Sequence, residues 1–71
     1  MSTVLDKNTV MLELKGGSEI VGDVLMGYTM RGGKYHGWTV RADTLMKWLK
    51  QGLVIREPDA ISNYAHFRWV G

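Results

Sequence analysis

The sequence predicts a small β-rich α+β domain in the order β-β-β-α-β-β, arranged as a strongly bent sheet or a small barrel with one helix. Several short segments alternate apolar and polar residues with a period of two, which is typical of half-buried strands. One segment instead spaces its apolar residues at i, i+3 and i+4 between helix-capping residues. The chain has 71 residues, 45% of them hydrophobic. This size fits a single domain over residues 1–71, with residues 1–8 as a flexible N-terminal arm.

The first two predicted strands form a hairpin. In residues 9–15, Val10, Leu12 and Leu14 alternate with polar or flexible side chains, which predicts a half-buried strand. The two glycines at positions 16 and 17 suit a two-residue hairpin loop. Residues 19–30 then form a long apolar run interrupted by Gly22 and Gly27. Glycine inside a strand often marks a bulge or bend, so we expect this second strand to curl.

Residues 31–34 read Arg-Gly-Gly-Lys and predict a second turn with a basic residue on each side. Residues 35–41 alternate again and predict a third strand. His36, Trp38 and Val40 would share one of its faces.

The helix follows directly. Asp43 suits an N-cap or a first-turn position, and Leu45, Trp48 and Leu49 form an apolar stripe. Gly52 suits the position after the helix, where Leu53 can pack back on Trp48 in a Schellman ending. Residues 53–56 predict a short strand ended by the proline at position 58. A loop to residue 63 and a last alternating strand over residues 64–70 complete the chain.

Charge is distributed unevenly along the chain. Residues 24–56 contain six basic residues and one acidic residue, whereas the segments on either side are slightly acidic. The same stretch holds five rings that can stack: Tyr28, Tyr35, His36, Trp38 and Trp48. Positive charge mixed with flat rings favours a surface for a polyanion, with nucleic acid as the first candidate. We expect all three tryptophans, at positions 38, 48 and 69, to lie in the core, because a small chain needs their buried area.

The last predicted strand carries a second aromatic and basic pattern. Its inner face would hold Ala65, Phe67 and Trp69, and its outer face Tyr64, His66 and Arg68. If this strand lay beside the third one, Tyr35 and Arg41 would extend the outer face into a platform for stacked bases. The alternative is an ordinary strand whose outer face carries these residues without a function.

The predicted helix presents Lys47 and Lys50, with Arg41 before it and Arg56 after it. These cations could follow a phosphate backbone. The alternative is a solvated helix face.

Several functional classes find little support. The chain has no cysteine, which excludes disulfides, a thiolate nucleophile and cysteine-bound zinc. Its two histidines, His36 and His66, do not have the spacing of a metal site or a catalytic triad. We therefore expect no enzymatic activity, no cofactor and no metal. No apolar run is long enough to cross a bilayer, and the N-terminus does not resemble a signal peptide, so we expect a cytoplasmic protein that does not contact membranes.

Two segments resemble known families. Residues 10–25, with Leu-Lys-Gly-Gly before a glycine-interrupted apolar run, resemble the first motif of Sm-like and related SH3-type barrels. This resemblance implies a hairpin with a bent second strand in a small SH3-like barrel. The second Sm motif, an Asn-containing turn before an Arg-Gly pair, is absent, so the resemblance does not imply the RNA pocket of that family for this chain. Residues 45–59 are similar to the end of a winged-helix domain, which implies a recognition helix followed by a two-stranded wing.

The sequence therefore predicts a non-enzymatic, nucleic-acid-binding regulatory module, with DNA and RNA not distinguished. Its expected binding residues are Arg31, Lys34, Tyr35, Arg41, Lys47, Lys50, Tyr64, His66 and Arg68. The alternative is a small protein inhibitor or adaptor, of the accessory kind found in phages and mobile elements, which docks on an acidic groove of a protein partner. Its methionines and rings would anchor that contact. Self-association through the first strand, left at a sheet edge, is a further alternative.

Overall fold

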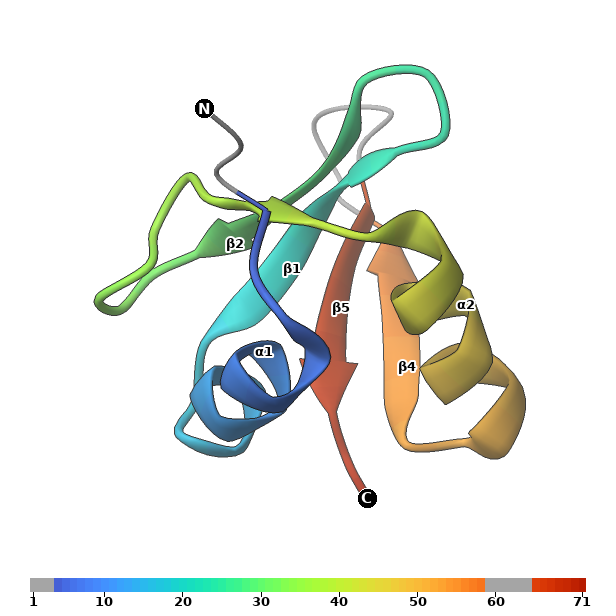
Figure 1. Ribbon diagram of the computed structural model, residues 1–71. Coiled ribbons are helices and arrows are strands. Elements are labelled where there is room, and N and C mark those ends of the chain that lie inside the picture. Colours follow the sequence, from blue (N-terminus) through green and yellow to red (C-terminus); the bar gives the residue numbers. More distant parts are fainter. Residues whose placement is uncertain (1–3, 59–64) are drawn as a thin grey trace.

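The computed structural model describes residues 4–58 and 65–71. Along the chain the elements are α1 (Lys7–Lys15), β1 (Glu19–Asp23), β2 (Gly27–Arg31), β3 (Thr39–Val40), α2 (Ala42–Gln51), β4 (Val54–Pro58) and β5 (Ala65–Trp69) (Figure 1). The fold class is α+β, as the sequence predicts. The predicted order is wrong, because a helix precedes the first strand and the described residues contain two helices.

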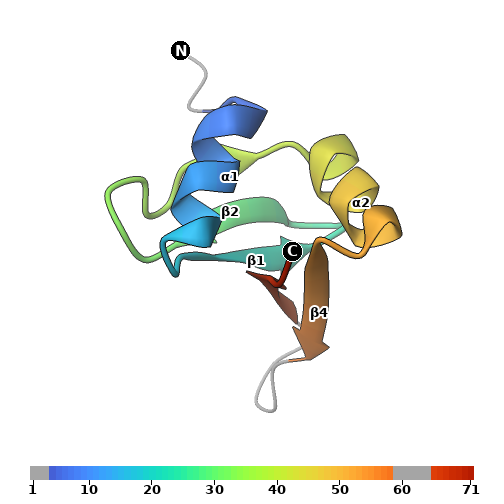
Figure 2. The same cartoon turned by 90° about the horizontal axis from the view of Figure 1, so that it is seen from below.

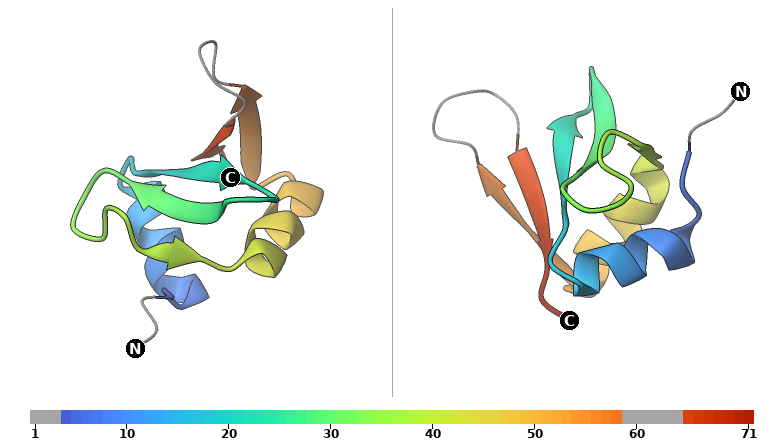
Figure 3. Two further views of the ribbon diagram at one scale, coloured as in Figure 1. Left: turned by 90° about the horizontal axis from the view of Figure 1, so that it is seen from above. Right: turned by 90° about the vertical axis from the view of Figure 1, so that its left-hand side faces the viewer.

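The strands form one antiparallel sheet in the order β3-β2-β1-β5-β4. Both helices lie on the same side of this sheet (Figure 2). Seen from above, β4 runs across the direction of β1 and β2, so the sheet is bent (Figure 3). The edge strands β3 and β4 do not pair with each other, and within the described residues the sheet is not closed into the predicted barrel.

The core lies between the bent sheet and the two helices. Two pairs of aromatic rings pack edge-to-face in it. The ring centres of Tyr28 and Phe67 are 5.6 Å apart, and those of Trp48 and Trp69 are 5.5 Å apart. Such pairs stabilise a core beyond the effect of their buried area. The fully buried side chains include Phe67, Ile20, Met30, Leu45, Val10 and Val54.

Residues 9–15 form most of α1, so the predicted first strand is wrong. Val10 and Leu14 are buried and four residues apart, as on one face of a helix, whereas Leu12 is 65% exposed. The Asp6 carboxylate caps the helix by accepting hydrogen bonds from the Thr9 N–H and hydroxyl, at 3.3 and 2.6 Å. Gly16 then ends the helix, and the two glycines lead into β1 instead of closing a hairpin.

The predicted long second strand is in fact a hairpin of β1 and β2. Gly22 has a φ of +138°, and a Cβ there would overlap the carbonyl oxygen of Gly27 on the opposite strand. Only glycine permits this close approach. The turn between the strands is residues 24–26, where the Asp23 carboxylate accepts two backbone hydrogen bonds.

The predicted third strand, residues 35–41, is reduced to Thr39 and Val40. The preceding residues form a loop closed by its own hydrogen bonds. In one of them the Gly32 N–H donates to His36 Nδ1 at 2.8 Å. Another joins the Trp38 N–H to the Tyr35 carbonyl at 3.0 Å. These local bonds compete with extended pairing, so the loop replaces most of the strand.

The predicted helix, its ending and the last two strands are confirmed. Asp43 lies in the first turn of α2, and Gly52 follows the helix with a φ of +76°. The Leu53 N–H donates to the Trp48 carbonyl at 3.0 Å, as a Schellman ending requires. The strands β4 and β5 fall where the alternation predicts, although β4 includes Pro58 at the sheet edge.

The two family resemblances do not extend to the fold. The Sm-like one implied a strand before the first two glycines, where α1 lies. The winged-helix one implied a separate two-stranded wing after the helix. The strands β4 and β5 do follow α2, but β5 also pairs with β1 and so belongs to the main sheet.

Residues 4–6 run beside β3. The Leu5 N–H donates to the Thr39 carbonyl at 2.9 Å, and the Leu5 side chain is buried. This contact places the first turn of α1 on the side that faces α2 (Figure 1). Neither helix in the described part of the chain is long and apolar enough to cross a membrane.

Candidate nucleic-acid interface

The structure separates the predicted binding residues into three regions. The open face of the sheet, opposite the helices, carries Arg31, His66 and Arg68. The loop between β2 and β3 carries Lys34 and Tyr35, and α2 with its first flanking residue carries Arg41, Lys47 and Lys50. Tyr64 lies outside the described residues.

The platform that would arise if the third and last predicted strands adjoined is not formed. Both β2 and β1 lie between β3 and β5, so the strand that holds Thr39 is at the far edge from His66 and Arg68. Tyr35 and Arg41 also lie outside β3, in the loop before it and the residue after it. Strand order is set by long-range pairing, which the alternation of single strands does not contain.

The open face of the sheet balances its cations with acids. Arg31 faces Glu19 in the register of β2 and β1. Arg68 Nε donates to Glu57 Oε1 at 2.9 Å, and His66 Nε2 lies 3.9 Å from the same oxygen. The hydrogen bond from Arg68 and the positive charges of Arg68 and His66 lower the pKa of Glu57. This face offers little free positive charge to a polyanion.

One group on this face has the donor atoms of a metal site. Ligand atoms of Glu19, Glu57 and His66 lie within 4.8 Å of one another. Arg68, however, already donates to Glu57, and His66 Nδ1 is buried with no hydrogen-bond partner in the described structure. Metal-binding histidines usually donate this second N–H to an acceptor, so the geometry is that of an ion-pair network.

The loop between β2 and β3 carries one basic and two aromatic side chains in successive contact. Lys34 Nζ lies 5.5 Å from the centre of the Tyr35 ring, and Tyr35 meets Trp38 edge-to-face at 5.3 Å. Trp38 is 40% exposed, so the prediction that it lies in the core is wrong. Trp48 is buried as predicted, and Trp69 is partly buried and packs against the core. The exposed indole remains available for stacking.

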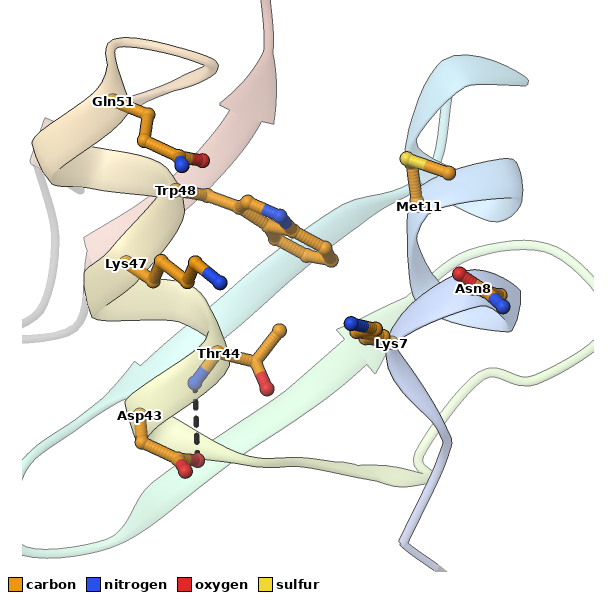
Figure 4. A pocket seen from close by; sticks show the side chains of 8 residues that line it. All are labelled: Lys7, Asn8, Met11, Asp43, Thr44, Lys47, Trp48 and Gln51. Atoms are coloured by element: carbon orange, nitrogen blue, oxygen red, sulfur yellow. Dashed lines mark hydrogen bonds between the residues drawn. The ribbon is translucent and has the colours of Figure 1, made fainter.

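A groove between the two helices brings together cations from distant parts of the sequence. It has a volume of about 410 Å³ and is lined by Lys7, Asn8, Met11, Asp43, Thr44, Lys47, Trp48 and Gln51. Figure 4 shows Lys7 on the α1 wall and Lys47 on the α2 wall, both reaching into the space between the helices. The Trp48 ring and the Met11 side chain form the apolar part of the lining.

The groove keeps its positive charge because its one acid is already occupied. Asp43 accepts from Arg41 Nε at 3.3 Å and from the Thr44 N–H at 3.0 Å. No carboxylate among residues 4–58 and 65–71 forms an ion pair with Lys7, Lys47 or Lys50. Lys50 is one turn from Lys47 on α2, so it extends the same positive surface. We call Lys7, Lys47 and Lys50 the groove lysines.

Sequence reasoning missed Lys7, which it assigned to the N-terminal arm within a slightly acidic segment. Only the placement of α1 and α2 on the same side of the sheet reveals its position opposite Lys47. Comparisons of the chain with models of protein families, with curated proteins and with solved structures return no significant match. Chemically, the groove offers two ammonium groups, two amides and a hydroxyl, which are donors suited to anionic oxygen atoms.

Proposed function

We propose that the protein is a non-enzymatic nucleic-acid-binding module whose groove between α1 and α2 holds the phosphate backbone. The observation that carries this proposal is the placement of Lys7 and Lys47 on opposite walls of the groove, with no ion-pair partner among the described residues. A phosphate bound in the groove between these two walls would be attracted by both ammonium groups.

The surroundings of the lysines support a chain of phosphates as the ligand. Asn8, Thr44 and Gln51 add neutral donors along the groove, and Lys50 continues the positive charge beyond it. Backbone contacts of this kind position a nucleic acid without reading its sequence. We therefore expect binding that depends on salt and is similar for different sequences.

The loop between β2 and β3 supplies the rings. In Figures 1 and 2, α1 lies between this loop and α2. A strand that leaves the groove across α1 would reach Tyr35 and the exposed Trp38, with Lys34 beside them. Stacking on such rings contributes about 1–3 kcal/mol per base. Since bases in a duplex are already stacked, we propose that single strands bind more tightly.

Fluorescence anisotropy with labelled single-stranded and duplex oligonucleotides, at low and at physiological salt, tests the proposal. The variants are Lys7→Glu and Lys47→Glu. The matched control is Lys15→Glu, at the other end of α1, where the ammonium lies over the Trp69 ring at 5.6 Å. Circular dichroism should show that all three variants remain folded.

We expect each groove variant to weaken binding about tenfold or more and the control to change it less than about threefold. Equal losses in all three variants would assign the effect to net charge and contradict the groove. No binding of the parent protein at low salt would contradict nucleic acid itself. It would favour the alternative, docking of the same cations on an acidic protein surface.

A further inference from the structure

The loop between β2 and β3 carries His36 between the two rings Tyr35 and Trp38. The Nδ1 atom of His36 accepts a hydrogen bond from the Gly32 N–H at 2.8 Å. A backbone N–H can only donate, so the ring nitrogen that faces it must carry a lone pair. The imidazole is then neutral, with its proton on Nε2. This hydrogen bond therefore exists only while His36 is uncharged.

The hydrogen bond to His36 fixes the turn that holds the two rings. The Trp38 N–H donates to the Tyr35 carbonyl at 3.0 Å, and Gly37, the third residue of this turn, has a φ of +87°. A positive φ at the third position alone is that of a type II turn. Across the turn, the rings of Tyr35 and Trp38 meet edge-to-face at 5.3 Å. The imidazole of the second residue thus ties the ring-bearing turn back to the end of β2.

The remaining hydrogen bonds on this side of the loop are long among the described residues. The Ser18 hydroxyl donates to the Gly32 carbonyl at 3.3 Å, and the His36 N–H donates to the Gly33 carbonyl at 3.4 Å. Gly32 and Gly33 both have positive φ, and glycine changes its backbone conformation at little cost. Loss of the bond to the imidazole would therefore loosen this side of the loop.

The charged groups around the loop provide no partner for a protonated imidazole. Arg31 and Lys34 flank it on the loop itself. On neighbouring elements, Glu19 of β1 lies opposite Arg31, and Glu13 of α1 lies against Gly33, where an added Cβ would come within 3.1 Å of the carboxylate. No carboxylate in residues 4–58 and 65–71 forms an ion pair with this imidazole. The ordered loop therefore favours the neutral ring.

We propose that this loop is a pH-sensitive switch, in which neutral His36 holds the two rings in place and protonation of its Nδ1 releases them. Histidine changes its charge between about pH 5 and 8, and His36 is exposed, so protons reach its ring. In the imidazolium, Nδ1–H would face the Gly32 N–H, and two donors form no hydrogen bond. Because acid favours the form that binds the proton, the loop is ordered above this pH range and loosened below it.

The consequence for nucleic acid rests on the proposed function. Protonation of His36 adds a positive charge, which strengthens the attraction of single strands and duplexes alike. A loosened loop no longer holds Tyr35 and Trp38 in place, and this affects only strands whose bases stack on these rings. We therefore expect acid to lower the preference for single strands over duplexes, whatever the change in overall affinity.

NMR of the free protein at pH 8 and pH 5 tests the switch without nucleic acid. The readout is the exchange of the Gly32 N–H with water, corrected for its intrinsic pH dependence. We expect its protection to fall about two- to tenfold in acid, as the loss of one hydrogen bond predicts. His36→Asn keeps an acceptor that does not titrate, so Gly32 should stay protected at both pH values. His36→Ala has no acceptor, so Gly32 should be unprotected at both.

His66→Gln is the matched control, because it removes the other histidine of the chain, which lies on β5. Its loop should respond to pH like that of the parent protein. Equal protection of Gly32 at both pH values in the parent overturns the switch. So does a His36→Ala variant that is as well protected at pH 8 as the parent, or a loss of the response in His66→Gln.

Anisotropy with single-stranded and duplex oligonucleotides at the same two pH values tests the consequence. In the parent protein, the ratio of single-strand to duplex affinity should fall at pH 5 by a factor similar to the loss of protection. In His36→Asn the ratio should stay constant. If the loop switches and the ratio does not change, the role of the rings in binding is contradicted and the switch itself stands. If the ratio falls equally in His36→Asn, its control by His36 is overturned.

Discussion

Neutralising Lys47 should change the salt dependence of nucleic-acid binding by a predictable amount. Each phosphate contact on a single strand contributes about −0.7 to the slope of log K against log salt concentration. If all three groove lysines contact phosphates, their slope is about −2.1, and Lys47→Gln reduces it to about −1.4. Between 50 and 200 mM salt, affinity should then fall about 18-fold in the parent protein and about sevenfold in the variant.

Arg41 provides an internal comparison, because it is equally basic but paired with Asp43 at 3.3 Å. We expect Arg41→Gln to change the slope less than Lys47→Gln does. The reciprocal variant, Asp43→Asn, removes the anion from the groove and frees Arg41, so it should tighten binding and steepen the slope.

The assay is anisotropy of one labelled single strand at five or more salt concentrations, with the same protein preparations checked for folding. A Lys47→Gln slope equal to that of the parent would refute the contact between Lys47 and phosphate. A larger change in Arg41→Gln than in Lys47→Gln would show that the ion pair does not occupy Arg41 in solution.

Three further outcomes follow from the structure. Gly22→Ala should lower the free energy of unfolding by about 3 kcal/mol or more, because the added Cβ would meet backbone atoms of the opposite strand. Gly52→Ala, where the added Cβ meets open space, should lower it by only about 1–2 kcal/mol. Urea unfolding compares the two variants, and equal losses would contradict the close approach at Gly22. Arg68→Gln should raise the pKa of Glu57 toward its usual 4.5, followed by NMR titration. The stabilisation linked to a lowered carboxyl pKa is present above the unfolded-state value and is lost as pH falls through the folded one. Parent and variant should therefore converge in stability once the pH is below the lowered pKa of Glu57, and an unchanged pKa in the variant would contradict the ion pair. Trp38→Ala should weaken single-strand binding more than duplex binding in the anisotropy assay, and equal effects would argue against stacking.

Local signals were sufficient for α2 and for the two strands that follow it. The helix α2 has a strong apolar stripe, a first-turn acid and a glycine whose positive φ ends it, all within a few residues. The strand β5 alternates clearly between Phe67 on the buried side and Arg68 on the exposed side. Neither element needs a distant partner to define its type.

The first helix was missed because two periods fit the same residues. Val10 and Leu14 share a face both in a strand and in a helix, and only Leu12 distinguishes the two. A leucine in that position favours burial, so the alternation suggested a strand. The structure instead leaves Leu12 exposed, and the cap at Asp6 and packing against the sheet determine the helix.

The same error hid half of the candidate site. With residues 9–15 as a strand, Lys7 belongs to an arm and has no defined neighbour. Once they form a helix, Lys7 begins its first turn and faces Lys47, which is 40 positions later. The charge pattern along the chain could suggest a polyanion, but the groove depends on how two helices, distant in sequence, are placed on one side of the sheet.

Folding also sorts the charges more sharply than the sequence suggests. On β1, Glu19 and Asp23 alternate with buried Ile20 and so lie on the open face of the sheet, together with Glu57 on β4. Among the described residues, Arg31, Arg68 and His66 lie on this same face, whereas the groove lysines, which have no ion-pair partner there, lie on the helix side. We therefore expect the nearly balanced open face to attract a polyanion less than the groove lysines do. If nucleic acid binds as proposed, this uneven distribution would favour docking on the helix side, although the formal net charge of the chain is only +2.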